Sequence, residues 1–498
     1  MEQAGIDIDL SLSILNDYNA GRVGRTPPVV PEGVPGVDGR RVIDLRSTES
    51  FTFTADEISG FRQRFPEAAA RLSLSGETVS LTAEELRETG IRLYPFFAYG
   101  FLNGGSATSY ADRKKNREFN EDLFRLYEPV FTPMAEQARG RPKGTTPGFI
   151  QPDGTPGPSY MELKLRSLLL QSRSCMDLTG NREIGKIPFF QMTSVSNDRS
   201  VRDALKEYQN SPWLKQLAEE TDHPVWSGES GIQPMITAYT HSEDGSTKTI
   251  FHPAGGEEST VLPLPGGHGQ CFRVLEPVLR KLHERGIRFI SLGNIDNLGY
   301  TADPLSLALL AIKGNPAGFD FSFRTPVDVK GGILIEEAGG QLNCVDLGVG
   351  ISHEEAARLE EQGYRILFNC ATGLFDLTWL LENLERIKKE LPLRFSDQNK
   401  DTGRYSQAEQ VTWEVIGMME NPLIFGIDKY KRFLAAKMLM ENLLTSGLSL
   451  DSPGFPEQDK SGGLHETAVR LHRGLGDLLR SQYGLVLKNN RWRPEEET

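Results

Sequence analysis

The sequence predicts an α/β fold, with a mostly parallel, Rossmann-like central sheet between helical N-terminal and C-terminal regions. Two observations predict it. Apolar runs rich in β-forming residues alternate with helix-like segments between about residues 90 and 390, and both ends of the chain contain helical patterns. Such alternation favours a parallel sheet with helices on both faces. At roughly 150 residues per unit, the 498 residues suggest about three regions, which we place at 1–90, 91–390 and 391–498.

The first region is expected to contain helices and loops. Its stretch RTPPVVPEGVPGVDG at 25–39 is rich in proline and glycine. Because proline lacks a backbone donor and fixes φ, this stretch cannot hold a regular helix. We expect it to run over the surface of the protein.

Four short runs supply the strands expected for the central sheet. They are PFFAYGFLNGG at 95–105, IPFFQMTS at 187–194, IRFISLGN at 287–294 and YRILFN at 364–369. Each is apolar and rich in β-branched or aromatic residues, as buried strands are.

Helix-like segments lie between and after these runs. In MELKLRSLLLQSR at 161–173 and GLFDLTWLLENLERIKKE at 373–390, apolar residues recur every three or four positions and so share one helix face. Beyond about 391 we expect helices over 430–447 and 465–484, the second of which should end at Gly484.

The composition excludes several classes of protein. A net charge of −13 disfavours nucleic acid and anionic lipid as partners, and a phosphate-bearing ligand must meet locally concentrated positive charge. No apolar run reaches the ~20 residues of a membrane helix, and the acidic start MEQAGIDIDL does not resemble a secretory signal. The four scattered cysteines predict buried thiols rather than disulfides or a zinc site. We therefore expect a cytoplasmic protein, and its oligomeric state is left open.

The first predicted strand ends in a glycine turn. Asn103, Gly104 and Gly105 leave bare backbone that can approach a phosphate or a base, and the hydroxyl of Ser106 lies beside it. A plain connecting turn would have similar residues. The glycine spacing matches neither a Walker A loop nor a GxGxxG fingerprint.

A basic loop follows at ARGRPKG. Arg139, Arg141 and Lys143 stand between glycines and a proline that hold the backbone in turns. Three cations on a stiff loop can neutralise a polyphosphate. A solvated basic loop is the commoner reading of such a pattern, but the restrained cations in an acidic protein favour the phosphate role here.

A carboxylate follows the third predicted strand. Asp296 is expected just beyond its carboxyl end, where open α/β sheets bind ligands, and a carboxylate there can hold Mg²⁺ against substrate phosphates. Asp303 is a second candidate, although its pairing with Pro304 is typical of a turn, which is the interpretation that we favour.

Two other glycine clusters are candidate ligand contacts. In LPGGHGQCFRVL at 264–275 a base can lie against bare backbone, with His268 or Gln270 supplying hydrogen bonds; a tight turn before a helix would have the same pattern. Lys330 precedes Gly331 in a predicted hairpin, where a solvated side chain is the simpler interpretation.

Taken together, these segments resemble the UTP:sugar-1-phosphate uridylyltransferases, the family of UTP–glucose-1-phosphate uridylyltransferase and UDP-N-acetylhexosamine pyrophosphorylase. The resemblance covers about residues 90–440 and rests on the order of several motifs. These are LNGGSATS at 102–109, RPKG at 141–144, GGHGQ at 266–270, NIDNLG at 294–299, ADP at 302–304, FN at 368–369 and RFLAAK at 432–437.

The resemblance implies a sheet of the nucleotide-diphospho-sugar transferase type and a catalytic, nucleotide-binding domain over 91–390. It implies that Lys143, Arg141 and, by its order in the chain, Lys400 act on phosphate, and that Asp296 binds Mg²⁺. Asn369 is implied to touch the sugar. The other implied substrate contacts are Asn103, Gly104, Gly105, Ser106, Thr193, Gly267, His268, Gly269, Gln270, Asn294, Asn297 and Lys330.

Three features depart from the family pattern. Ala107 stands where the second glycine of a GxGT motif is usual, and its Cβ is expected to crowd the phosphates; Ser109 replaces an arginine found in some members. The interval between the glycine turn and Lys143 is unusually long, which indicates an insertion containing Arg113, Lys114 and Lys115. The helical C-terminus does not resemble the β-helix of the glucose enzymes.

The implied reaction joins UTP and a hexose 1-phosphate into a UDP-hexose with release of pyrophosphate, by in-line attack on the α-phosphorus assisted by Mg²⁺. Glucose 1-phosphate is expected because it is the commonest substrate of the family. Three alternatives remain open: a UDP-N-acetylhexosamine pyrophosphorylase, a catalytically silent nucleotide-sugar binding protein, and a nicotinamide-dependent oxidoreductase. The last would leave Lys143 and Asp296 without a purpose.

Overall fold

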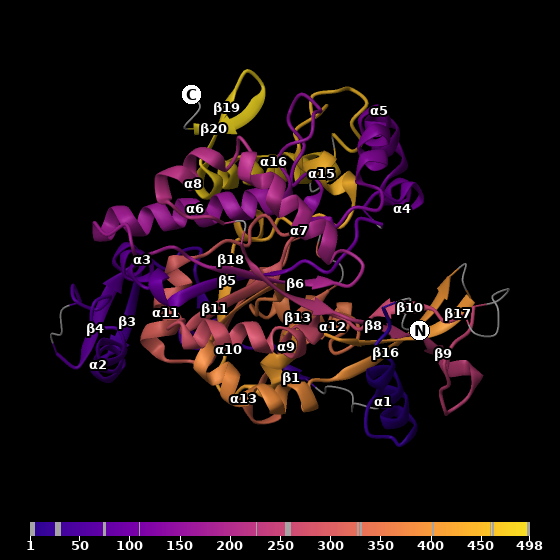
Figure 1. The fold of residues 1–498 in the computed structure, drawn as a ribbon, viewed down its shortest axis with the longest axis horizontal. Helices are drawn as coiled ribbons and strands as arrows, with labels where there is room; N and C mark the ends of the chain where they lie inside the picture. Colours follow the sequence, from indigo (N-terminus) through magenta and orange to yellow (C-terminus); the bar gives the residue numbers. More distant parts are fainter. Residues whose placement is uncertain are drawn as a thin grey trace.

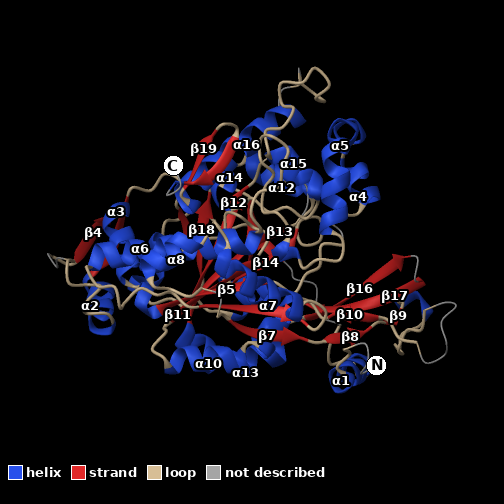
Figure 2. Ribbon diagram, turned by 45° about the horizontal axis from the view of Figure 1, so that its top comes forward, coloured by secondary structure: helices blue, strands red, loops and turns tan. Residues whose placement is uncertain are grey.

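The computed structural model describes residues 5–24, 31–72, 76–108, 110–225, 227–253, 260–325, 328, 331–400, 403–458, 460 and 463–495, with only the backbone described at Lys400. A large twisted sheet crosses the molecule between two layers of helices (Figures 1 and 2). No helix among the described residues is long and apolar enough to cross a membrane.

The central sheet contains eleven strands. Its main path runs β2 (Val42–Asp44), β18 (Leu423–Ile427), β12 (Ala317–Phe323), β15 (Leu367–Asp376), β11 (Phe289–Asn294), β5 (Phe97–Leu102), β6 (Phe189–Ser194) and β7 (Glu229–Gln233). Within this path β15 is antiparallel to both of its neighbours, and every other neighbouring pair is parallel. The predicted α/β fold with a mostly parallel sheet is therefore confirmed.

Three strands branch from this path beside β15. They are β13 (Gly332–Glu337), β14 (Leu342–Asp346) and β1 (Pro31–Gly33). The pair β13 and β14 forms the hairpin that the sequence predicts near Gly331. β1 lies in the Pro/Gly-rich stretch and pairs with β13, so this end of the stretch joins the sheet edge; residues 25–30 lie outside the described part.

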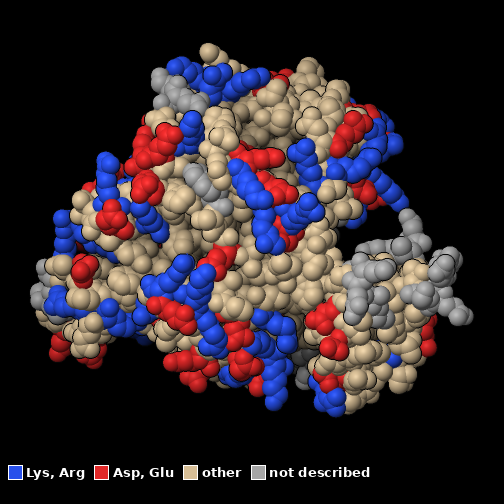
Figure 3. All heavy atoms as spheres, viewed as in Figure 1, with Lys and Arg blue, Asp and Glu red and all other residues tan. Residues whose placement is uncertain are grey.

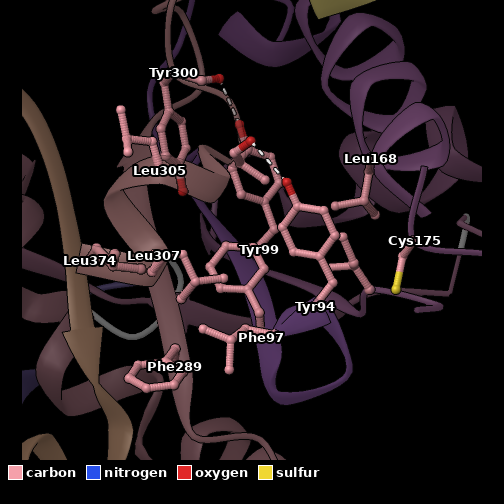
Figure 4. Close-up of a cluster of buried hydrophobic side chains, with 14 of the residues drawn as sticks. Tyr94, Phe97, Tyr99, Leu168, Cys175, Phe289, Tyr300, Leu305, Leu307 and Leu374 are labelled. Carbon is pink, nitrogen blue, oxygen red and sulfur yellow. Dashed lines mark hydrogen bonds between the residues drawn. The ribbon is translucent and has the colours of Figure 1, made fainter. Parts of the chain in front are cut away.

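Each sheet face has its own apolar core because successive residues of a strand point to opposite faces. In β5, Phe97, Tyr99 and Phe101 pack into one cluster, whereas Ala98 and Leu102 pack into the other. Figure 4 shows part of the first cluster, where aromatic side chains of the sheet pack against leucines of the covering helices.

The helices lie over both faces of the sheet. The first core cluster takes residues from α2 (Ala55–Arg64), α3 (Ala83–Arg92), α6 (Tyr160–Thr179), α8 (Lys215–Thr221), α11 (Pro304–Lys313) and α16 (Leu464–Tyr483). The second takes residues from α9 (Cys271–Val274), α10 (Glu276–Glu284) and α13 (Leu377–Glu390). As predicted, α16 ends at Gly484, which has a φ of 54°.

Smaller elements complete the chain. The remaining helices are α1 (Ile8–Asn19), α4 (Arg113–Phe119), α5 (Glu121–Ala138), α7 (Asp198–Glu207), α12 (His353–Glu361), α14 (Lys429–Arg432) and α15 (Leu439–Thr445). The remaining strands are β3 (Ser50–Thr54), β4 (Thr78–Thr82), β8 (Met235–Thr237), β9 (Tyr239–Thr240), β10 (Pro263–Pro265), β16 (Leu393–Lys400), β17 (Gly403–Gln410), β19 (Leu485–Lys488) and β20 (Arg491–Pro494).

Two predicted helices have different bounds. The helix predicted from 373 begins at Leu377, because residues 373–376 continue β15 and pair with β11. The helix predicted over 430–447 is interrupted between α14 and α15. There Leu434 accepts a backbone hydrogen bond from Leu298 and donates one to the Asn297 side chain, so the backbone is used in tertiary contacts rather than in a helix.

The predicted division at residues 90 and 390 stays a prediction. The central sheet draws β2 from the first predicted region and β18 from the last. Both end regions also contain strands, which the sequence patterns did not predict.

Candidate functional site

The carboxyl ends of the parallel strands gather the predicted site residues at one edge of the sheet. β5 and β11 are parallel and in register, with Leu102 opposite Asn294, so Asn103 and Asp296 follow neighbouring strand ends. In β15, which runs the opposite way, Thr372 lies opposite Gly293. Asn369 therefore falls beyond the same end of β11.

The surface is hollowed beside this edge. Figure 3 shows a recess between the part of the molecule that contains α4 and α5 and the part that contains β9 and β17. The chain enters the first part after β5 and the second after β7, so both flanking parts continue from carboxyl strand ends. Acidic and basic side chains are mixed over the rest of this face.

The glycine turn pairs with the basic loop. Lys143 donates a backbone hydrogen bond of 3.0 Å to Gly105, and Ala107 donates one of 2.9 Å to Arg141. The side chain of Asn103 is fully buried, and a Cβ at Gly144 would overlap it. The two motifs therefore form one backbone unit, with Gly105, Ser106 and Arg141 exposed on it.

Lys143 is buried beneath this unit, at 6% exposure. Within the described part of the chain its Nζ has no hydrogen-bond partner. The Nζ lies 3.5 Å from the ring centroid of Tyr110 and 5.0 Å from that of Tyr160. Burial lowers the pKa of Lys143 to about 8, against the attraction of Asp296 and Glu441. An unpaired buried ammonium of this kind is placed to receive an anion.

Asp296 lies within electrostatic reach of Lys143. Burial raises the pKa of Asp296, while the positive charges of Lys143, Lys437 and Lys164 oppose that rise. Asp296 is half-buried, and its carboxylate makes no hydrogen bond to another described residue. The predicted proximity of Lys143 and Asp296 is therefore present in the structure.

Lys164 is a buried cation beside Asp296 that the sequence analysis missed. It is fully buried in α6, and its Nζ donates hydrogen bonds to the backbone carbonyls of Asn297 and Tyr300. Tyr99 donates a further hydrogen bond of 2.6 Å to the Tyr300 carbonyl, as Figure 4 shows. Together they hold the loop that carries Asp296. The sequence signal that could have identified Lys164 was its position on the apolar face of the helix predicted over 161–173.

The turn at 266–270 packs against the end of β17. Gly267 has a φ of 84°, and a Cβ there would overlap the backbone of Gln410. Gln410 in turn donates a backbone hydrogen bond of 3.0 Å to Gly266. Gly269 also lies too close to Gln410 to carry a side chain. These glycines are thus required by packing, besides any contact with a ligand.

Gln233 links this turn to the first glycine turn, and the sequence analysis missed it as well. Its Nε2 donates a hydrogen bond of 2.8 Å to the Gly267 carbonyl, and its Oε1 lies 3.0 Å from the position that a Cβ on Gly104 would take. Its signal was weak, since the strand ESGIQ that it ends has no strong apolar pattern.

His268 and Gln270 differ in how their side chains are used. Nδ1 of His268 accepts a hydrogen bond of 3.1 Å from the Thr412 backbone, and burial with nearby Lys437 lowers the pKa of His268 to about 4. The imidazole is therefore neutral. Gln270 is buried, and its Oε1 has no hydrogen-bond partner among the described residues. Lys143 Nζ and Asn103 Oδ1 are likewise buried polar atoms without a hydrogen-bond partner among the described residues.

Other predicted contacts have side chains that are occupied within the protein. Asn297 is fully buried; its Oδ1 accepts from the backbones of Gly299 and Leu434, and its Nδ2 donates to the Arg432 carbonyl. Thr193 is also fully buried and donates a hydrogen bond of 2.7 Å to Asp198. Both side chains hold site loops in place, and their expected substrate contacts stay predictions.

Asn294 and Asn369 lie at the site edge in half-buried positions. Asn294 ends β11, and its carbonyl accepts a backbone hydrogen bond from Asn297. Oδ1 of Asn369 accepts a hydrogen bond of 2.6 Å from the Ala371 backbone, while its Nδ2 lies 3.3 Å from the Cys344 sulfur. The amide of Asn369 thus keeps some hydrogen-bonding capacity.

Lys400 is not brought to this cluster. It pairs with Gly403 at the tip of the β16–β17 hairpin, whereas Gln410, which touches the glycine turn, pairs with Leu393 at the base. The seven residue steps between Leu393 and Lys400 correspond to about 23 Å at ~3.3 Å each. The backbone of Lys400 therefore lies at the far end of the hairpin from the glycine turn, and its expected phosphate contact stays a prediction. Lys330 and Ser109 lie outside the described residues.

Ala107 does not crowd the turn as the sequence suggested. Its side chain is fully buried in the cluster formed with Tyr110, α5 and α15. The Cβ therefore points into the protein, away from exposed Gly105.

Asp296 is the residue of this site that could hold Mg²⁺. Among the described residues no group of three or more His, Cys, Asp or Glu side chains is arranged to hold a metal ion. The carboxylate of Asp296 nevertheless fits Mg²⁺, which proteins commonly hold through one or two carboxylates while phosphates and water supply the other ligands.

Comparison with known proteins gives matches in sequence and in fold. The family model described as UTP--glucose-1-phosphate uridylyltransferase matches residues 242–450. A UTP--glucose-1-phosphate uridylyltransferase of Encephalitozoon cuniculi (strain GB-M1) is 31% identical over 269 residues, which are 47% of this chain and 51% of that protein. The chain thus spans about half the length of this curated relative.

Two solved structures from Trypanosoma brucei share the fold. Its uridine diphosphate N-acetylglucosamine pyrophosphorylase has a TM-score of 0.54 and 15% identity, with 80% of each chain covered. Its UDP-glucose phosphorylase has a TM-score of 0.53 and 16% identity, covering 90% of this chain and 76% of that one. The predicted resemblance to the UTP:sugar-1-phosphate uridylyltransferase family is therefore confirmed, in sequence over residues 242–450 and in fold over most of the chain.

Proposed function

We propose that the protein is a UTP:sugar-1-phosphate uridylyltransferase, which converts UTP and a hexose 1-phosphate into a UDP-hexose and pyrophosphate. The unpaired buried ammonium of Lys143, facing Asp296 across one sheet edge, is the observation that carries this proposal. Glucose 1-phosphate is proposed as the sugar substrate because the matching family model and the curated relative are both described as a UTP--glucose-1-phosphate uridylyltransferase.

The proposed mechanism uses positioning and charge rather than a protein nucleophile. Transfer at phosphorus depends mainly on alignment of the reactants and on neutralisation of charge. The backbone unit of Gly105 and Lys143 receives the triphosphate, and the Lys143 ammonium offsets charge on the α-phosphate and the leaving pyrophosphate. Bound Mg²⁺ would neutralise phosphate charge from the side of Asp296.

Of the two glycine turns, the second, at 266–270, is proposed to hold the nucleotide base. Gln233 connects them, and the free Oε1 of Gln270 is a buried acceptor beside the second turn. Asn369, at the far end of the same edge, is proposed to contact the sugar. The two glycine turns and Asn369 thus lie along one edge in the order base, phosphate, sugar.

The test is a panel of pyrophosphate-release assays with UTP, Mg²⁺ and the 1-phosphates of glucose, galactose and N-acetylglucosamine. We expect the fastest release with glucose 1-phosphate. Fastest release with N-acetylglucosamine 1-phosphate would instead assign the UDP-N-acetylhexosamine reaction. Binding of UDP-sugar without release from any substrate would reject catalysis, and stabilisation by NAD(P) but not by UTP would reject the nucleotide assignment.

A cytoplasmic location belongs to the same proposal. It is tested by cell fractionation with antibodies against the protein, and recovery in a membrane or secreted fraction would contradict it.

A further inference from the structure

The ammonium of Lys143 is held by ring faces rather than by acceptors. Its Nζ lies 3.5 Å from the centroid of the Tyr110 ring, and no described residue accepts a hydrogen bond from it. The negative face of an aromatic ring attracts a cation, most strongly when both are removed from water. Here both partners are buried, Tyr110 at 1% and Lys143 at 6% exposure.

This mode of binding leaves the donors of Lys143 free. A carboxylate in the place of the ring would accept hydrogen bonds from the ammonium and would compete with a substrate phosphate. The ring restrains Nζ and compensates part of its charge without using those donors. The lysine is thus fixed in position yet able to bind an anion.

Tyr110 belongs to the insertion that separates the glycine turn from Lys143. Its backbone carbonyl accepts a hydrogen bond of 3.1 Å from Leu439 and one of 3.0 Å from the Asn116 side chain. Its ring packs in a cluster with residues of α5 and α15. The backbone at Tyr110 is therefore bonded to both α15 and α4.

Asn442 of α15 joins the two rings that flank Lys143. Its Nδ2 donates hydrogen bonds of 3.0 Å to the Tyr110 hydroxyl and 3.2 Å to the Pro147 carbonyl in the lysine segment. The Tyr160 hydroxyl donates one of 3.3 Å to its Oδ1. One side chain thus connects the insertion, α6, α15 and the segment that carries Lys143.

We propose that Tyr110 is a positioning residue, and that the insertion serves to hold its ring against Lys143 so that the ammonium meets the triphosphate in one fixed place. The inference rests on the proposed uridylyl transfer, since it names what prepares the phosphate-binding lysine of that reaction. The insertion, whose presence the motif spacing indicated, is thereby given a role at the site.

The test compares three variants of the full chain. Tyr110→Leu removes the ring, whereas Tyr110→Phe keeps it and loses only the hydroxyl. Tyr127→Leu is the matched control. Tyr127 is an equally buried tyrosine of the insertion whose hydroxyl donates to the Leu448 carbonyl, whereas the rings beside the Lys143 ammonium are those of Tyr110 and Tyr160. All three are first compared with the wild type in thermal melting.

We expect Tyr110→Leu to lower kcat for pyrophosphate release by about tenfold or more, with a smaller change in KM for UTP, because the ring acts on the position of one charge. Tyr110→Phe should stay within about threefold of the wild type, since the ring face is retained. Equal losses in Tyr110→Leu and Tyr127→Leu would mean that the insertion only stabilises the fold, and would overturn the proposal. An unchanged kcat in Tyr110→Leu, with an active wild type, would overturn it as well and leave the uridylyl transfer standing.

A second readout does not depend on activity. Acetylation of Lys143 by acetic anhydride, followed by peptide mass spectrometry, measures how well its Nζ is held. We expect severalfold faster acetylation in Tyr110→Leu than in Tyr110→Phe or Tyr127→Leu. Equal rates in all variants would contradict the proposal, including in the case in which the wild type releases no pyrophosphate and the uridylyl transfer itself is rejected.

Discussion

The burial of Lys143 is unfavourable for folding. A buried ammonium without hydrogen-bond acceptors loses its hydration, and two ring faces compensate only part of that loss. Lys143→Met has nearly the same length but no charge. We therefore expect it to raise the free energy of unfolding by about 1–3 kcal/mol and to lower turnover by about 100-fold or more.

The effect of Lys143→Met on the free energy of unfolding is predicted to depend on pH. The folded-state pKa of Lys143 is lowered to about 8, below its ordinary value, so the unfolded chain binds the extra proton over the range between the two. The destabilisation is complete below about pH 8 and is relieved as the pH rises above it. The difference in urea-unfolding free energy between Lys143→Met and the wild type should shrink from pH 7 to pH 10, and a difference that is constant or grows would contradict the account.

Asp296 is predicted to set the metal requirement. Asp296→Asn removes the carboxylate proposed to hold Mg²⁺ while keeping the size of the side chain, so the Mg²⁺ concentration for half-maximal rate should rise about tenfold or more. The measurement is a Mg²⁺ titration of pyrophosphate release. Asp303→Asn is no control here, because Asp303 pairs with Arg432 at 2.9 Å. A titration curve that coincides with that of the wild type would remove Asp296 from the metal site.

At the scale of elements, the two glycine turns are predicted to respond differently to a side chain. Gly267→Ala places a Cβ against the Gln410 backbone at a φ of 84°, so it should lower both the free energy of unfolding and the affinity for UTP. Gly105→Ala meets no atom within 4 Å and needs no unusual φ, so its stability should equal that of the wild type.

The decisive measurement compares the affinity for UTP of Gly105→Ala with that of the wild type. If Gly105 is glycine because a phosphate approaches its backbone, Gly105→Ala weakens UTP binding severalfold without a change in melting temperature. Calorimetric titration with UTP measures this. Full affinity in Gly105→Ala would show that the first turn is a plain connector.

Interruption of the predicted helix at 430–447 shows where local patterns are insufficient. The sequence between Phe433 and Met438 has ordinary helix formers, yet its backbone bonds to the Asp296 loop through Leu434. Tertiary hydrogen bonds of this kind override the helix propensity of the segment, and its pattern of apolar residues does not predict them. The same segment carries Lys437, whose charge acts on Asp296.

At the scale of the whole molecule, the sheet order explains what the sequence could predict about the site. The carboxyl ends of parallel strands share one edge, so motifs after β5 and β11 come together whatever lies between them. That rule was sufficient to bring the glycine turn and Asp296 together, whereas Lys143 joins them through the hydrogen bonds between its loop and the glycine turn. The rule could not identify Lys164, because a lysine in a helix is ordinarily exposed. It also could not place Lys400, because the distance from Lys400 to the site depends on the direction of the β16–β17 hairpin.

The sheet also joins the ends of the chain to its middle. β2 pairs with β18, and along the main path only β5, β6 and β7 lie side by side in the order of the sequence. Apolar runs identify strands but not their neighbours, so the predicted regions at 1–90 and 391–498 were described as helical and their strands were missed. Such pairings are visible only in three dimensions.

The central claim is that Lys143 and Asp296 act on one triphosphate, and a double-mutant cycle in the rate of pyrophosphate release tests it most directly. The rates of the wild type, Lys143→Met, Asp296→Asn and the double variant are measured with UTP, Mg²⁺ and glucose 1-phosphate. Groups that act as a unit are strongly non-additive, so we expect each single variant to lose about 100-fold or more and the double variant to be little slower than the slower single one. Losses that multiply, as for two independent sites, would contradict the account.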